Sequence, residues 1–166
     1  YKRQVDTSGP ALAAALSEGV FLAKPNQREF CELTGVAPAD RRGQEQAALD
    51  MVRRGAAEIV ALTLGAEGAV IASASGLLRI PPVSVEPQSA VGAGDSFVGA
   101  FVLALSQGRP LANAACLASA AGVAALLTPG TELCREADVR RIDRALAARM
   151  GLETLDDARQ RVPSAK

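Results

Sequence analysis

The segment Val91-Gly92-Ala93-Gly94-Asp95 places two glycines and an acid directly before a long apolar run. If a helix begins here, its first amide groups are unpaired, and the helix dipole favours an anion at this end. The glycines would let a phosphate approach the backbone closely. Asp95 could then take a proton from a hydroxyl group that attacks phosphorus, which is the base role in phosphoryl transfer. Spacing alone leaves a second interpretation open, that Asp95 simply caps the helix, since Asp is among the favoured N-cap residues.

A second polar turn, Lys24-Pro25-Asn26-Gln27-Arg28-Glu29, follows an apolar run that predicts a strand. Lys24 could meet a phosphate as a point charge, and Asn26 and Glu29 lie one helical turn apart on the same face. Such a pair could hold a hydrated Mg²⁺ ion, which keeps its waters and uses few carboxylates. The alternative is a capping box, in which the two side chains bond reciprocally with the backbone at the start of a helix.

A third turn, Thr63-Leu64-Gly65-Ala66-Glu67-Gly68, also follows a predicted strand. Its glycines could form an anion nest for nucleotide phosphates. A simple turn between two strands is the equally open alternative. Ligands of α/β folds bind beyond the carboxyl ends of the strands, so three polar or glycine-rich turns in such positions together favour nucleotide binding.

Two other phosphate-binding motifs are excluded by spacing. A dinucleotide fingerprint requires a third glycine at position 97, where Phe97 stands instead. A Walker loop requires Gly-Lys-Ser/Thr, and none of the three lysines, at positions 2, 24 and 166, follows a glycine.

Composition excludes further classes. The chain of 166 residues has no histidine, which rules out a Ser-His-Asp triad and an imidazole-based zinc site. Its 18 basic and 18 acidic residues cancel, which argues against a nucleic-acid partner. The three cysteines lie far apart, and their odd number favours a reducing, cytoplasmic location over a disulfide framework. The apolar run 111–127 is mostly alanine and predicts a buried helix rather than a membrane span.

Helical patterns alternate with short apolar runs, which predicts an α/β fold with a mostly parallel sheet. The predicted strands are Val20–Ala23, Ile59–Leu64, Ala69–Ala72 and Leu77–Ile80. Asn26 and Asp40 are the expected N-caps of two helices, which Gly35 and Gly55 end. Later helices are expected over about 95–106, from Pro110 to Leu127, and in an amphipathic segment whose apolar face holds Val139, Ile142 and Leu146.

The three turns, together with the Gly-Thr-x-Leu-Cys stretch at Gly130–Cys134, resemble the carboxyl-terminal half of the PfkB/ribokinase family of sugar kinases. The resemblance covers about Asp6 to Leu146, and Gly-Ala-Gly-Asp-Ser before an apolar helix is highly specific to the family. The sequences of the Lys24 turn and of the Gly130–Cys134 stretch are similar to those of the minor 6-phosphofructokinase branch. The implied fold is a ribokinase-like, Rossmann-like three-layer sandwich that lacks its amino-terminal half and lid.

The resemblance also implies roles for named residues. Asp95 would be the general base, and the amides of Gly92, Ala93 and Gly94 would form the anion hole. The residues expected to bind ATP and its Mg²⁺ ion are Lys24, Asn26, Glu29, Thr63, Gly65 and Gly68, with Ser119 and Val123 bordering the adenine. Asn26 and Glu29 would hold the Mg²⁺ through water. A monovalent cation such as K⁺ would lie near Ser89, Val91, Ala125, Thr128 and Gly130.

We therefore expect residues 1–150 to be the nucleotide-binding and catalytic half of a kinase domain, followed by a polar tail over 151–166. The expected reaction is ATP-dependent phosphoryl transfer to a hydroxymethyl group of a hexose phosphate, with fructose 6-phosphate preferred over tagatose 6-phosphate or fructose 1-phosphate. The alternative is a noncatalytic nucleotide-binding module or one half of a split enzyme. The expected partners are ATP and a sugar phosphate, with a homo-oligomer or association with an amino-terminal half, and neither nucleic acid nor membrane.

Overall fold

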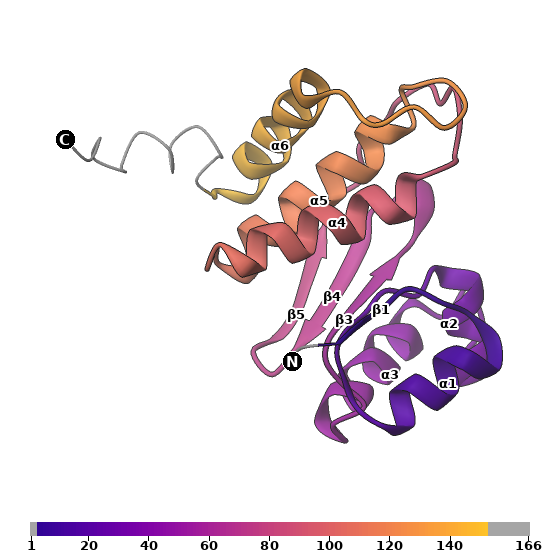
Figure 1. Ribbon diagram of the computed structural model, residues 1–166. Helices are drawn as coiled ribbons and strands as arrows, with labels where there is room; N and C mark the ends of the chain where they lie inside the picture. The colour runs from indigo at the N-terminus through magenta and orange to yellow at the C-terminus, as the bar shows by residue number, and fades with distance from the viewer. Residues whose placement is uncertain (1–2, 153–166) are drawn as a thin grey trace. The chain divides into compact units, whose positions relative to one another are not determined.

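The structure, a computed structural model, describes residues 3–152 of the chain (Figure 1). The chain divides into two compact units, Tyr1–Pro82 and Val83–Lys166. Of the predicted tail, only Gly151 and Leu152 belong to the described residues, and Gly151 adopts the left-handed conformation that ends the last helix. The rest of that prediction lies outside the described residues.

The first unit is built on a five-stranded sheet in the order β1-β2-β3-β4-β5. The strands are β1 (Gln4–Val5), β2 (Val20–Ala23), β3 (Ala57–Thr63), β4 (Ala69–Ser73) and β5 (Gly76–Ile80). β1, β2 and β3 pair in parallel, whereas β4 pairs antiparallel with both β3 and β5. The α/β prediction is confirmed, but the sheet is mixed rather than mostly parallel. The connections over 64–68 and 74–75 are too short for a parallel crossover, which takes a dozen or more residues.

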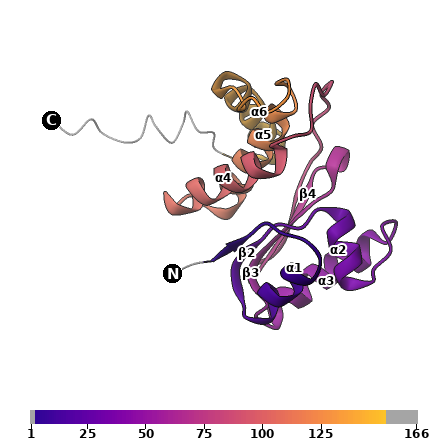
Figure 2. The same ribbon diagram turned by 45° about the vertical axis from the view of Figure 1, so that its right-hand side comes forward.

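Three helices pack on the sheet of this unit, α1 (Gly9–Ser17), α2 (Gln27–Thr34) and α3 (Arg41–Arg53). Figure 2 shows them together on one face of the sheet, where they bury a continuous apolar core. Leu12 of α1, Phe30 of α2 and Met51 of α3 all contribute to this core.

The predicted helix ends in this unit are confirmed. Asn26 caps α2 by accepting a hydrogen bond from the amide of Glu29. Asp40 caps α3 by accepting one from the amide of Gly43 at 2.8 Å. Gly35 ends α2 in the left-handed region, with φ of 72°. Local capping chemistry therefore sets where the polar turn after β2 becomes a helix.

Within its described residues, the second unit has three helices, α4 (Ala93–Ser106), α5 (Leu111–Ala125) and α6 (Glu136–Met150). α5 packs against both α4 and α6, and its many alanines let the helices approach closely. Phe97 and Phe101 of α4 meet edge to face, with ring centroids 5.7 Å apart. Ile142 and Leu146 of α6 are buried, as their spacing predicts.

None of the helices within residues 3–152 is long and apolar enough to cross a membrane. Cys116 is buried on α5, and all three cysteines are free thiols.

Candidate active site

In the first unit, two of the predicted turns lie side by side. The amide of Thr63 at the end of β3 donates to the carbonyl of Pro25 at 3.1 Å, and Asn26 and Thr63 form a parallel bridge. The backbone pairing of β2 and β3 thus continues past the end of β2 as far as Asn26, opposite the last residue of β3. This pairing brings the Lys24–Glu29 turn next to the Thr63–Gly68 turn at the carboxyl edge of the parallel strands.

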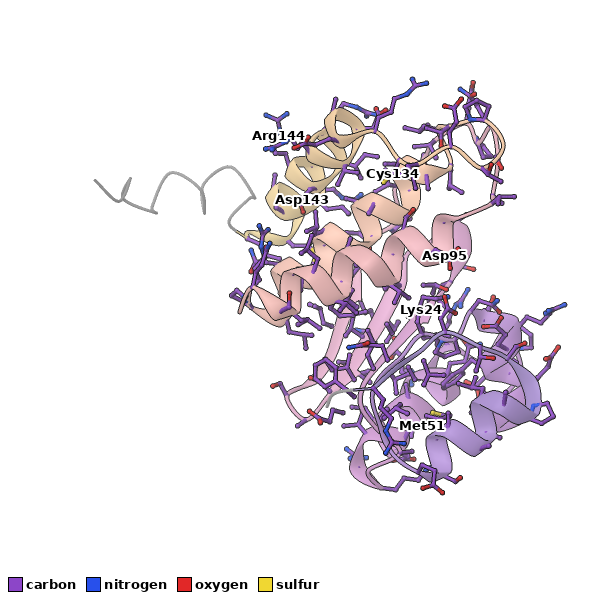
Figure 3. All side chains as sticks on the ribbon, viewed as in Figure 1. Lys24, Met51, Asp95, Cys134, Asp143 and Arg144 are labelled. Atoms are coloured by element: carbon purple, nitrogen blue, oxygen red, sulfur yellow. The ribbon has the colours of Figure 1, made fainter. Side chains whose placement is uncertain are left out.

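Lys24 begins the first of these turns and is almost fully buried, with 7% of its side chain exposed. Its ammonium group lies 3.1 Å from a carboxylate oxygen of Asp6, whose side chain is 31% exposed. A buried ammonium group is costly unless it is paired, so this contact explains how the site tolerates the charge. Figure 3 labels Lys24 on the ribbon of the first unit.

Asn26 and Glu29 form the capping box that was one of the two interpretations. The Asn26 side chain accepts from the Glu29 amide, and Glu29 Oε2 accepts from the Asn26 amide, both at 2.9 Å. Because a carboxylate has two oxygens and about four lone-pair sites, this bond leaves acceptor capacity on Glu29. The capping box and a water-mediated Mg²⁺ contact are therefore compatible. Across residues 3–152, no group of three or more His, Cys, Asp or Glu side chains could hold a metal ion.

The glycine turn after β3 contains a short 3-10 helix, η1 (Gly65–Glu67). Gly65 and Gly68 have positive φ angles of 58° and 90°. A Cβ atom on Gly68 would lie 2.1 Å from the carbonyl oxygen of Ile80, so only glycine fits there. Glu67 forms an ion pair with Arg41 at the start of α3, which ties the turn to that helix.

In the second unit, the start of α4 contradicts one of the two interpretations of Asp95, namely that Asp95 caps this helix. Gly92 is the N-cap residue, with φ of 78°, and the helix begins at Ala93, two residues before the expected start. Asp95 therefore lies in the first helical turn and is exposed, and no side chain caps this helix. The interpretation of Asp95 as the N-cap is wrong, and its carboxylate stays available beside the first amides of α4. Figure 3 labels Asp95 at this helix start.

Three of the residues predicted for the monovalent cation lie together in two loops of this unit. Ser89 Oγ donates to the carbonyl of Gly130 at 3.0 Å and accepts from the amide of Val91 at 3.1 Å. The amide of Gln88 donates to the carbonyl of Leu126 at 2.7 Å, which joins the two loops a second time.

The remaining two cation-site residues lie at the end of α5. Buried Thr128 has its hydroxyl within bonding distance of the carbonyls of Ala125 and Glu132, at 3.0 and 3.1 Å. These loops are therefore rich in carbonyl and hydroxyl oxygens, the donor type that hard cations take.

Ser119 and Val123, the two residues predicted to border the adenine, lie one turn apart on α5. Ser119 Oγ is buried and has no hydrogen-bond partner among the described residues, whereas Val123 is half-buried. Between them, Gly122 lies close to the start of α4, since a Cβ there would be 3.2 Å from the carbonyl of Ala93. α5 thus supports the first turn of α4 from within the same unit.

The structure gathers the predicted residues into two groups, one in each unit. It adds Asp6, to which the sequence pattern assigned no role in the site. A signal for it was present, because Asp6 directly follows a short strand in the same way that Lys24 follows the next one.

Known proteins resemble this chain in sequence and in fold. A family model described as pfkB family carbohydrate kinase matches residues 2–138. The ATP-dependent 6-phosphofructokinase isozyme 2 of Mycobacterium tuberculosis is 41% identical over 137 residues, which are 82% of this chain and 40% of that protein. The chain thus spans less than half the length of this relative.

Solved structures show the same relationship. Phosphofructokinase-2 from Escherichia coli, in complex with substrates and products, has a TM-score of 0.83 and 38% identity over 88% of this chain and 48% of that one. A second structure of the E. coli protein, in complex with potassium, has a TM-score of 0.80 and 39% identity, covering 88% of this chain and 48% of that one. Ribokinase from Arabidopsis thaliana has a TM-score of 0.70 at 22% identity, over 85% of this chain and 46% of that one, and shows that the fold is ribokinase-like.

With a family model that covers most of its length and a relative that shares two fifths of the aligned residues, the chain belongs to the pfkB family of carbohydrate kinases.

Proposed function

We propose that the protein transfers the γ-phosphoryl group of ATP to a hydroxymethyl group of a hexose phosphate, with fructose 6-phosphate as the preferred acceptor. The observation that carries this proposal is the start of α4, where Gly92 caps the helix and leaves the exposed Asp95 carboxylate in the first turn. The name of the M. tuberculosis relative supports the choice of acceptor.

In the proposed reaction, the Asp95 carboxylate accepts the proton of the attacking hydroxyl group. The hydroxyl oxygen forms a bond to the γ-phosphorus, the bond from phosphorus to the β-γ bridging oxygen breaks, and ADP leaves. The amides at Gly92, Ala93 and Gly94 donate hydrogen bonds to the oxygens of the moving phosphoryl group. Each such preorganised donor in a dry site is worth about 3 kcal/mol of transition-state stabilisation.

The two turns at the end of β2 and β3 would hold the nucleotide. Lys24 supplies a buried positive charge, and the glycines at 65 and 68 let phosphate oxygens approach the backbone. The free oxygen of Glu29, with Asn26, would bind a water of the Mg²⁺ ion, which when present neutralises charge on the phosphates. The oxygen-rich loops at Ser89 and Thr128 would hold a monovalent cation such as K⁺ and so order the turn before α4.

The proposal is tested with purified protein, first by calorimetric titration with MgATP and then by a coupled assay of ADP release with fructose 6-phosphate. We expect Asp95→Asn to lower kcat by about a hundredfold or more while leaving MgATP affinity within about twofold. Asp138→Asn is the matched control, because Asp138 holds the same place in the first turn of α6. It should leave kcat unchanged.

Three outcomes would revise the proposal. Full activity of Asp95→Asn would remove the assigned base. MgATP binding without turnover for any acceptor would favour the noncatalytic or split-enzyme alternative. A higher kcat/KM with tagatose 6-phosphate or fructose 1-phosphate than with fructose 6-phosphate would keep the chemistry and change the acceptor.

A further inference from the structure

The ion pair between Asp6 and Lys24 follows from strand register rather than from local sequence. β1 and β2 are parallel neighbours in which Val5 lies opposite Ala23. Asp6 follows Val5 at the end of β1, and Lys24 follows Ala23 at the end of β2. The amide of Lys24 also donates to the carbonyl of Val5 at 3.1 Å, which extends the ladder to this point. The backbone therefore holds the two side chains next to each other at the edge where the polar turns meet.

The burial of the two groups is unequal. The Lys24 side chain is 7% exposed, whereas that of Asp6 is 31% exposed, and their charged atoms are 3.1 Å apart. The charge of Lys24 therefore depends on Asp6 more than the charge of Asp6 depends on Lys24, because the ammonium group has little access to water. A lysine side chain is a flexible four-carbon stem, and a fixed partner limits the positions that its ammonium group occupies.

We propose that Asp6 is a positioning residue that holds the Lys24 ammonium group in place for the phosphates of the bound nucleotide. This inference rests on the proposed function, and it assigns Asp6 no direct contact with substrate. An ammonium group has three N–H donors, so one bond to Asp6 leaves two for phosphate oxygens. The pair thus fixes the direction of the lysine without using up its hydrogen-bonding capacity.

The test is a double-mutant cycle on MgATP affinity, with Asp6→Asn, Lys24→Met and the double variant. We expect Asp6→Asn to raise the Kd for MgATP about ten- to a hundredfold, the range for one lost charge-assisted hydrogen bond. In the Lys24→Met background the same substitution should change the Kd less than about twofold, because Asp6 then has nothing to position. Asp6→Glu keeps the charge at a longer reach and should give an intermediate Kd.

A second readout separates positioning from general damage to the fold. Affinity for adenosine, which has no phosphate, should be the same in Asp6→Asn as in the unmodified protein, whereas a disturbed fold would weaken both ligands. In turnover assays the KM for MgATP should rise more than kcat falls. The matched control is Glu45→Gln, which breaks another inter-element ion pair, to Arg79, outside these turns and should leave both affinities unchanged.

The outcomes also separate this inference from the proposed function. No MgATP binding by the unmodified protein would overturn both. Weaker binding in Lys24→Met together with unchanged binding in Asp6→Asn would overturn only the positioning role. Equal effects of Asp6→Asn with and without Lys24 would overturn it as well. If Asp6→Asn fails to fold, the Asp6→Glu variant and the charge-free double variant decide between these cases.

Discussion

Gly92 is the residue on which the candidate catalytic turn depends most directly. Its φ of 78° lies in the left-handed region, although a Cβ there would meet no atom within 4 Å. The requirement for glycine is therefore one of backbone conformation and not of space. Any other residue would favour a different path into α4 and would move the amides that precede Asp95.

We predict that Gly92→Ala destabilises the fold by about 1–2 kcal/mol, the cost of a left-handed conformation for a residue with a Cβ. It should also lower kcat, because the first amides of α4 no longer converge on one position. Gly99→Ala is the matched control, since Gly99 lies within the same helix and also has open space around it. That variant should be more stable by about 0.5–1 kcal/mol in urea unfolding and fully active.

Equal loss of stability in the two glycine variants would contradict the conformational argument. A stable but inactive Gly92→Ala would instead place the whole effect on the geometry of the turn.

The reactivity of the Cys116 thiol tests the packing of α5 against α6. Burial, reinforced by the negative charge of Asp143, raises the pKa of the Cys116 thiol from 9.0 to about 11. Its sulfur also lies 3.4 Å from that of Met150. We predict that iodoacetamide at pH 8 modifies Cys31 and Cys134, which are partly exposed, well before Cys116. Mass spectrometry of the labelled peptides measures the order, and early labelling of Cys116 would contradict it.

The same thiol gives a pH dependence. Because the pKa is raised in the folded state, the thiol's contribution to stability is complete below about pH 9 and is lost as pH rises to about 11. The free energy of unfolding should therefore fall over this window. Cys116→Ala is the comparison, and it should show a shallower decline across the same pH range.

At the scale of elements, a comparison of α2 and α3 distinguishes the effect of helix capping from the effect of ligand binding. Asn26 and Asp40 both accept a backbone amide at a helix start. We predict that Asn26→Ala and Asp40→Ala each cost about 1 kcal/mol of stability. Only Asn26→Ala should also raise the Mg²⁺ concentration required for half-maximal activity, because Asn26 lies beside Glu29 in the proposed metal contact. An equal Mg²⁺ requirement in both variants would argue against that contact.

The contact between α5 and α4 is the second element-scale feature with a direct test. A Cβ on Gly122 would lie 3.2 Å from the carbonyl of Ala93 and 3.4 Å from Cβ of Phe97. Alanine there has better helix propensity but requires the start of α4 to shift by a few tenths of an ångström. We predict that Gly122→Ala leaves thermal stability nearly unchanged and lowers kcat severalfold, since small displacements of catalytic groups reduce rates steeply. An unchanged kcat would show that the α4 start tolerates the shift.

Sequence reasoning located most elements because their signals are local. The Asn26 and Asp40 caps, the glycine ends of helices and the apolar strand Val20–Ala23 each depend on neighbouring residues. Strand direction was misjudged, because apolar runs look alike in parallel and antiparallel strands, and only the short connection over 64–68 distinguished them. The Asp6 contact was missed because it joins residues far apart in sequence through strand register.

At the scale of the whole molecule, the residues proposed to act in phosphoryl transfer all lie within the described range 3–152. The chain spans 40% of the M. tuberculosis relative and 48% of the E. coli chain. The three turns that carry the proposed chemistry nevertheless all fall within the 2–138 range that the family model matches. The comparison of kcat/KM for fructose 6-phosphate, tagatose 6-phosphate and fructose 1-phosphate is therefore the measurement that links this chain to an acceptor.

The mixed sheet also has a consequence for how the chain folds. β3, β4 and β5 pair with their immediate neighbours in sequence through short turns, so closing these loops costs little chain entropy. β1 and β2 pair only after the chain has crossed over through α1, and β2 and β3 only after α2 and α3. The hairpins can thus form first and offer β3 as an edge on which β2 and then β1 assemble. By this order, the Thr63 amide reaches the carbonyl of Pro25 when β2 joins β3, and the ion pair of Asp6 with Lys24 forms last, when β1 joins β2.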